Sequence, residues 1–271
     1  MNFFEFIPEG IKDGTVTAWL HSTESFSEMQ SYAYKRPAII ICPGGGYEMN
    51  SEREAEPVAK RYFAAGFNTF ILRYAVKEKA KDFYPLCQLA SAIAHVRKYA
   101  DEWYIAKDKI AVIGFSAGGH LACSLGTLFN EERFLNVFGR QDDIRPNAMI
   151  LSYPVITADE FAHKGSISRV SGAEIGSDEY KWFGLDKHVD AQTPPTFLWH
   201  TAEDKSVPVE NSLKIAAALS AASVPFELHI FPKGGHGSSV CNMEVNSPNP
   251  YNGRWVEWSI KWLNELFEFV V

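Results

Sequence analysis

The chain has 271 residues, of which 46% are hydrophobic and 22% charged, a composition typical of a globular protein. Its formal net charge of −7 argues against a nucleic-acid partner, because nucleic-acid binding needs a basic face. No apolar run approaches the roughly 20 residues of a membrane-spanning helix, so we expect no membrane partner. The N-terminal residues lack the basic start of a signal peptide, and the four cysteines form no Cys-x-x-Cys pair. We therefore expect a protein of the reducing cytoplasm.

Short apolar runs rich in β-branched residues alternate along the chain with longer amphipathic segments. The apolar runs predict buried strands at 38–42, 68–74, 109–114, 148–153, 196–200 and 226–231. The amphipathic segments predict helices at 51–65, 85–99, 116–129, 208–221 and 254–269. The first of these helices is expected to open with a capping box, Ser51 with Glu54 three residues later. This alternation predicts an α/β fold with a doubly wound, mostly parallel sheet and helices on both faces.

Two segments depart from this rhythm. The first 35 residues are expected to add antiparallel edge strands, and 15–20 is the best candidate. Residues 155–195 show weak periodicity and close on a Thr-Pro-Pro sequence. A connection of this length inside a compact domain is usually functional, so we interpret it as a small cap over the C-terminal edge of the sheet. The expected organisation is a single domain over 1–271 with a small cap insertion at about 155–195.

A predicted strand-to-helix turn at 114–118 carries the sequence Gly-Phe-Ser-Ala-Gly. In this context G-x-S-x-G forms a nucleophile elbow, a tight turn that exposes the serine at the start of a helix. The helix dipole favours the negative charge that develops when the serine attacks a carbonyl. Ser116 is therefore the candidate nucleophile. From the pentapeptide alone, a glycine-rich turn without a catalytic function stays open.

A glycine run, the sequence Pro-Gly-Gly-Gly-Tyr at 43–47, directly follows the first of the predicted central strands. Successive glycines let backbone N–H groups converge on one substrate oxygen, as in an oxyanion hole. Gly45, Gly46 and the N–H of Ala117 are the oxyanion-hole candidates. A phosphate-binding loop is the alternative, but a P-loop needs a Gly-Lys-Ser/Thr sequence that this run lacks.

The partners of a serine in such an elbow are expected later in the chain, first the acid and then the histidine. Asp204 lies just past the strand predicted to end at 200, and it is favoured over Glu203 because it precedes the Val-Pro that starts the next helix. His236 lies between glycines after the last predicted strand. Its role would be to take the Ser116 proton and return it to the leaving group, while Asp204 fixes the imidazole tautomer. No spacing of metal-binding residues predicts a metal site, and we expect no cofactor.

These segments together resemble the α/β-hydrolase esterase/lipase family, close to bacterial acetyl xylan esterase-like sugar esterases. The likeness spans about 37–240 and is carried by the glycine run, the Ser-Glu-Arg-Glu segment at 51–54, the elbow, and the segments around Asp204 and His236. The resemblance implies an α/β-hydrolase fold. It also implies a serine carboxylesterase that removes small acyl groups, above all acetyl, from sugars or xylo-oligosaccharides through an acyl-enzyme.

Three side chains are candidates for contact with the substrate. Tyr47 and Trp182 offer aromatic faces to a sugar ring or an acyl chain. Arg53 belongs to the segment beside the glycine run that the family shares. For Arg53 and Glu56 a role in a salt bridge and cap of the first helical turn stays open, and for Trp182 a place in the core of the cap is an alternative.

Two other functions stay open. A prolyl-peptidase-like serine hydrolase has a similar triad order, although those peptidases usually carry a large extra domain for which 271 residues leave no room. A non-catalytic hydrolase-fold binding protein is disfavoured by the intact nucleophile, acid, base and glycine run. The expected partner is a small-molecule acyl ester, with an acetylated sugar foremost. Apolar residues near Phe267 and Phe269 leave a homodimer open.

Overall fold

The computed structural model describes residues 1–22, 34–139 and 144–270, and within them an eight-stranded sheet has the order β1-β2-β4-β3-β5-β6-β7-β8. Its strands are β1 (Asn2–Phe6), β2 (Thr15–Leu20), β3 (Arg36–Cys42), β4 (Asn68–Arg73), β5 (Ile105–Phe115), β6 (Ala148–Ser152), β7 (Thr196–Thr201) and β8 (Phe226–Phe231). β2 pairs antiparallel with β1 and with β4, and every pairing from β4 to β8 is parallel. The predicted doubly wound, mostly parallel sheet is confirmed.

The predicted strands recur in the sheet, with two differences. The 15–20 segment is β2, but β1 lies outside it as the edge strand. β5 begins at Ile105, before the predicted start at 109. The charged sequence Lys-Asp-Lys at 107–109 interrupts the apolar run, so the sequence does not predict this extension. In the structure Ile105 is fully buried and pairs with Arg36 of β3.

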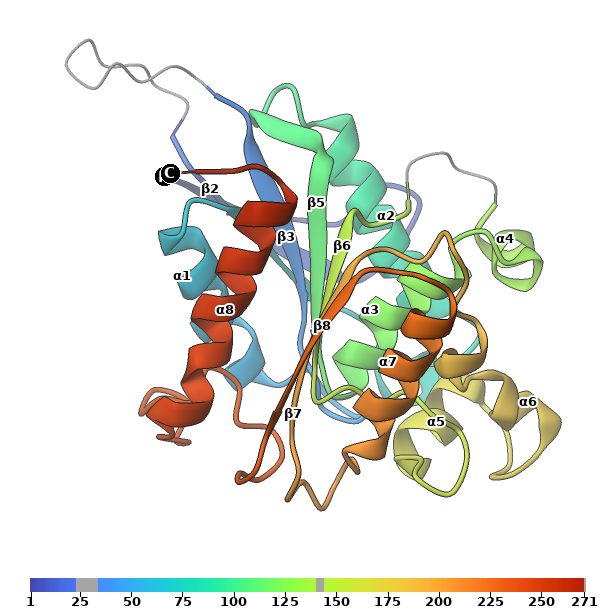
Figure 1. The fold of residues 1–271 in the computed structure, drawn as a ribbon. Helices are drawn as coiled ribbons and strands as arrows, with labels where there is room; N and C mark the ends of the chain where they lie inside the picture. The colour runs from blue at the N-terminus through green and yellow to red at the C-terminus, as the bar shows by residue number, and fades with distance from the viewer. Residues whose placement is uncertain (23–33, 140–143, 271) are drawn as a thin grey trace, which may run out of the picture.

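Helices cover both faces of the sheet (Figure 1). One face carries α1 (Glu56–Ala64) and α8 (Pro250–Leu266), and the other carries α2 (Tyr84–Lys98), α3 (Ala117–Leu128) and α7 (Glu210–Ala221). Shorter elements are η3 (Lys77–Lys79) and α4 (Glu132–Phe138). Because side chains alternate along a strand, Ile40 of β3 packs in the core under α2 and α3, while Ile39 and Ile41 pack under α1 and α8. No helix in the described ranges has the length and apolarity needed to cross a bilayer.

The helix expected from Ser51 begins later than the sequence indicates. Ser51 makes no side-chain capping bond, and a single turn, η2 (Glu52–Glu54), precedes α1. Glu54 is only 2% exposed and hydrogen-bonds outside its own turn. The capping-box interpretation is therefore wrong, because tertiary partners compete successfully for this carboxylate.

The segment between β6 and β7 folds into three short elements, α5 (Lys164–Ser171), α6 (Asp178–Trp182) and η4 (Leu185–Lys187). Ile167 of α5 and Leu185 of η4 are fully buried in the same core as α3 and α7. In Figure 1 these elements lie beside α7. The interpretation of 155–195 as a cap, and of the chain as a single domain, stays a prediction.

All four cysteines are free and buried. Cys42 ends β3, Cys87 lies in α2, Cys123 lies in α3, and Cys241 lies before α8. Burial raises the pKa of every one of these thiols, to about 11 for Cys87 and Cys241. A neutral, buried thiol packs as a small apolar side chain.

Candidate active site

Ser116 is the single residue between β5 and α3. Its backbone angles, φ 52° and ψ −117°, lie in a region that non-glycine residues rarely adopt. The neighbouring glycines make this turn possible, because a Cβ at Gly114 would overlap the backbone of Gly118, and a Cβ at Gly118 would overlap the carbonyl of Cys42. The strained turn holds the Ser116 hydroxyl at the C-terminal end of β5, at the residue that precedes the first turn of α3.

The structure brings Ser116, His236 and Asp204 into one series of hydrogen bonds. Nε2 of His236 lies 2.8 Å from Oγ of Ser116, and Nδ1 lies 2.6 Å from Oδ2 of Asp204. The Asp204 side chain is 1% exposed, whereas His236 is 21% exposed. Glu203, the alternative acid, is exposed to solvent. In this arrangement the imidazole can accept the serine proton while the carboxylate holds its other nitrogen protonated.

Asp204 is held by more groups than His236 alone. Its Oδ1 accepts hydrogen bonds from the N–H groups of Ser206 and Val207 at 2.9 and 3.0 Å. On the other side, Nε2 of the fully buried His200 lies 3.4 Å from Oδ2. Burial raises the pKa of Asp204, but hydrogen bonds from His200 and His236 outweigh burial and hold the pKa well below its usual value. Asp204 therefore stays ionised, and His200, which the sequence places only at a strand end, contacts the site.

Three backbone N–H groups around Ser116 fit the predicted oxyanion hole. The N–H groups of Gly45, Gly46 and Ala117 donate no hydrogen bond to another described residue. Gly45 and Gly46 adopt φ angles of 120° and 67°, which glycine tolerates, and both line the cavity that contains Ser116. Ala117 opens α3, where the first N–H groups of a helix lack partners within the helix.

The cavity beside Ser116 has a volume of about 610 Å³ and includes His236 in its lining. Arg53 and Arg169 also line it. Arg169 forms an ion pair with Glu48 at 2.8 Å, whereas the Arg53 side chain makes no hydrogen bond or ion pair with any described residue. Its guanidinium lies beside Gly237, where an added Cβ would come within 3.3 Å of Nη2. Arg53 is thus available to a ligand, as the sequence predicts.

The structure does not bring Tyr47 or Trp182 to this cavity. Tyr47 is fully buried, and its hydroxyl lies 3.0 Å from Nδ1 of His120. Trp182 packs edge-on against Phe83 and beneath the guanidinium of Arg133, 4.3 Å from the ring centre. Both rings are occupied by packing within the protein, so neither has a surface directed at Ser116.

Glu56 also lies outside the cavity lining. Its carboxylate pairs with Lys60 one turn along α1, at 3.0 Å. The side chain is 56% exposed, so this is a surface ion pair, which agrees with the salt-bridge role that the sequence leaves open for Glu56. We assign Glu56 no part in the site.

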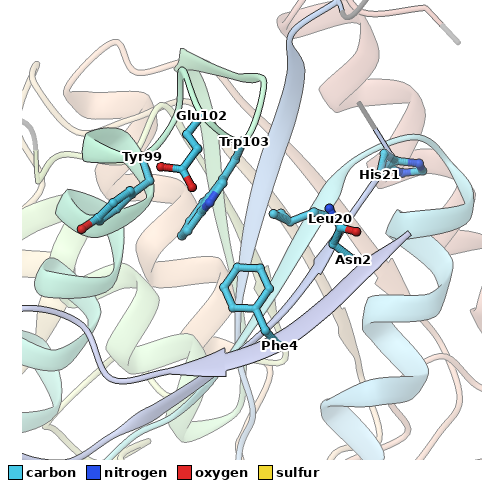
Figure 2. A pocket seen from close by; sticks show the side chains of 7 residues that line it. All are labelled: Asn2, Phe4, Leu20, His21, Tyr99, Glu102 and Trp103. Atoms are coloured by element: carbon cyan, nitrogen blue, oxygen red, sulfur yellow. The ribbon is translucent and has the colours of Figure 1, made fainter. Parts of the chain in front are cut away.

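A second cavity of about 410 Å³ lies where α2 leads into β5 (Figure 2). Its side chains include Tyr99, Glu102 and Trp103, but the Trp103 ring is stacked against Tyr99 and Phe70, with ring centres 5.3 and 5.8 Å apart. Burial lowers the pKa of its His21 to about 4, so this ring is neutral at pH 7. Because its described lining holds no nucleophile beside a base, this cavity does not compete with the one at Ser116.

The BD-FAE family model matches residues 28–219 of the chain. Over 225 residues the chain is 36% identical to endo-1,4-beta-xylanase B of Butyrivibrio fibrisolvens, an alignment that covers 82% of this chain and 35% of that protein. Over 207 residues it is 31% identical to an acetylxylan esterase of Xylanibacter ruminicola, covering 74% of this chain and 40% of the relative. The chain thus spans less than half the length of these two curated relatives.

A solved structure gives the same result in three dimensions. The acetyl ester-xyloside bifunctional hydrolase from Caldicellulosiruptor lactoaceticus is 36% identical, with a TM-score of 0.80 over 95% of this chain and 89% of that chain. The α/β-hydrolase fold and the resemblance to esterases of this type, both expected from the motifs, are confirmed.

Proposed function

This chain belongs to the BD-FAE family, and from that premise we propose that it is a serine carboxylesterase acting on small acyl esters. The observation that carries the proposal is the hydrogen-bonded series of Ser116, His236 and Asp204 beside an open cavity. The substrate we propose is an acetyl ester of a sugar or xylo-oligosaccharide. The similarity of the chain to an acetylxylan esterase and to an acetyl ester-xyloside hydrolase supports this class.

In the first half of the proposed reaction, Oγ of Ser116 attacks the ester carbonyl carbon as Nε2 of His236 accepts the hydroxyl proton. The carbonyl oxygen takes the negative charge and accepts hydrogen bonds from the N–H groups of Gly45, Gly46 and Ala117. When the tetrahedral intermediate collapses, the bond to the alcohol oxygen breaks, and the alcohol leaves with the proton from the imidazolium. The acyl group is then an ester of Ser116.

The second half reverses these roles with water. A water molecule gives a proton to Nε2 of His236 and attacks the acyl carbon, and the same N–H groups hold the oxyanion. Collapse releases the carboxylic acid, and the imidazolium returns its proton to Oγ of Ser116. Asp204, ionised throughout, stabilises the imidazolium in both halves. Each cycle consumes one water and one ester.

Replacement of the nucleophile tests the reaction class. We expect Ser116→Ala to lower the hydrolysis of p-nitrophenyl acetate by about 10⁴-fold or more and to abolish covalent labelling by a fluorophosphonate probe. Ser220→Ala, which changes an exposed serine of α7, should behave as the wild type in both assays. Retention of activity or labelling by Ser116→Ala would rule out the proposal.

The acyl and alcohol specificity needs a separate comparison. Acetate release from acetylated xylo-oligosaccharides should exceed product release from a feruloyl ester and from a long-chain triglyceride at equal concentration. A preference for the feruloyl ester would replace the proposed acetyl substrate while leaving the esterase assignment intact. We place this activity in the reducing cytoplasm, in line with four free, buried thiols.

A further inference from the structure

A buried carboxylate, Glu54, lies beside the nucleophile in the lining of its cavity and takes no part in the steps above. Both oxygens of Glu54 accept hydrogen bonds, Oε2 from the N–H of Gly44 at 2.8 Å and Oε1 from the hydroxyl of Tyr153 at 2.7 Å. A Cβ added to Gly44 would lie 2.6 Å from Oε2 of Glu54 and 3.1 Å from Cβ of Ser116. The carboxylate and the nucleophile therefore flank the same glycine, the first of the glycine run.

Tyr153 extends this contact to the segment that carries the base. Its hydroxyl accepts a hydrogen bond from the N–H of Ser239 at 2.9 Å. Oγ of Ser239 in turn donates to the carbonyl of Arg53 at 2.6 Å. The Tyr153 ring also packs edge-on against the imidazole of His236, with ring centres 5.0 Å apart. One tyrosine therefore joins Glu54 to the backbone and to the side chain of the histidine segment.

We propose that Glu54 is a positioning residue that fixes the glycine run and the His236 segment relative to Ser116, acting through Gly44 and Tyr153. The Gly44 N–H donates to the carboxylate, whereas the next two N–H groups of the run donate no hydrogen bond to a described residue and belong to residues that line the cavity. The inference rests on the proposed esterase function, because it assigns a task to a residue beside that site. Interior carboxylates are costly to bury, and two donors to this one account for its retention.

The surroundings of Glu54 act on its pKa in opposite directions. Burial raises the pKa of Glu54, while hydrogen bonds from Tyr153 and Gly44 and the nearby His236 favour the ionised form. The titratable or charged groups that face His236 or Glu54 from the surrounding elements are Asp204, Arg53, His163, Tyr153 and Tyr74.

Replacement of this carboxylate by an amide of the same shape is the test. In Glu54→Gln one of the two donors loses its acceptor. We expect kcat for p-nitrophenyl acetate to fall about 10- to 100-fold, with KM changed less than about twofold. Glu56→Gln, an exposed carboxylate two residues on, is the matched control and should match the wild type.

A milder variant keeps the inference falsifiable if Glu54→Gln fails to fold, as judged by circular dichroism. Tyr153→Phe removes one hydroxyl and leaves the carboxylate, and we expect kcat to fall several-fold while Ser116 still reacts with the fluorophosphonate probe. The double variant should lose less than the product of the two single losses, because both break one network. Wild-type kcat in Tyr153→Phe, or a folded Glu54→Gln with wild-type kcat, would overturn the inference alone. A wild-type protein that neither hydrolyses esters nor reacts with the probe would overturn the esterase proposal as well.

Discussion

Arg53 carries an unpaired positive charge at the mouth of the candidate site. Of the other cavity-lining charges in the described chain, Arg169 is paired with Glu48 and Glu52 with Arg73, at 2.8 and 2.7 Å. A guanidinium presents several donors in a fixed plane and suits hydroxyl or carboxylate oxygens of a sugar. We propose that Arg53 takes part in substrate recognition rather than in the bond-breaking steps.

The separate roles of binding and chemistry make Arg53 testable. Arg53→Met should raise KM for an acetylated xylo-oligosaccharide about 10-fold, because a charge-assisted hydrogen bond contributes roughly 1.5–3 kcal/mol. KM for p-nitrophenyl acetate, which has no sugar, should change less than about twofold. Arg254→Met, which removes an arginine stacked on Tyr251, serves as the control. Equal changes for both substrates would remove Arg53 from sugar recognition.

The catalytic candidates could be predicted from sequence because each sits in a local pattern. Ser116 lies in a glycine-bounded pentapeptide, and His236 lies between glycines after a strand. Glu54, Tyr153 and His200 could not be found in this way. Tyr153 and Glu54 are separated by 99 residues, and His200, although only four residues before Asp204, belongs to no local motif that marks a catalytic partner. For Glu54 the local pattern even indicated another structure, since a glutamate three residues after a serine resembles a capping box.

Among the elements, those with continuous apolar runs were predictable and those that depend on tertiary contact were not. β8 has the predicted bounds, whereas of the antiparallel edge strands expected in the first 35 residues only 15–20 was located, because the exposed positions of β1 give no apolar run. α8 begins at Pro250, before the predicted start at 254, because the Asn249 side chain accepts a hydrogen bond from the N–H of Asn252. α4, α5 and α6 are short helices, too brief to show a helical period.

The junction of β5 and α3 makes a stability prediction at the level of these two elements. A Cβ at Gly114 would overlap the carbonyl of Gly118, so strand and helix approach closer there than any side chain permits. Gly114→Ala should lower the free energy of unfolding by about 1–3 kcal/mol or more, measured by urea denaturation. Gly235→Ala is the matched control, since a Cβ there meets no atom within 4 Å, and it should change stability by less than about 0.5 kcal/mol. Similar losses in both variants would contradict the close approach.

At the scale of the whole molecule, a buried histidine couples folding to pH. His120 is fully buried, with Nε2 3.0 Å from the carbonyl of Phe183. Burial lowers the pKa of His120 from 6.5 to about 4. Between these values the unfolded chain binds a proton at this ring and the folded chain does not. The contribution of the neutral His120 ring to the free energy of unfolding is therefore complete above pH 6.5 and is lost as the pH falls toward 4.

Urea denaturation at pH 7, 6, 5 and 4 would measure this coupling. We expect the free energy of unfolding to fall across the series, with His120 accounting for about 3 kcal/mol at most. His120→Gln cannot titrate in this range, so it should start less stable at pH 7 and lose stability less steeply. An unchanged slope in the variant would show that other groups carry the pH dependence.

The reactivity of the four buried thiols reports on the local opening of the folded chain. Only a thiolate reacts quickly with an alkylating reagent, and burial keeps each of these cysteines protonated and out of reach while its element stays closed. Because they lie in β3, in α2, in α3 and before α8, each reports on a different part of the molecule. Timed pulses of iodoacetamide followed by mass spectrometry would therefore measure how fast each of four regions opens in one sample. The experiment uses the native cysteines and needs no engineered labelling site.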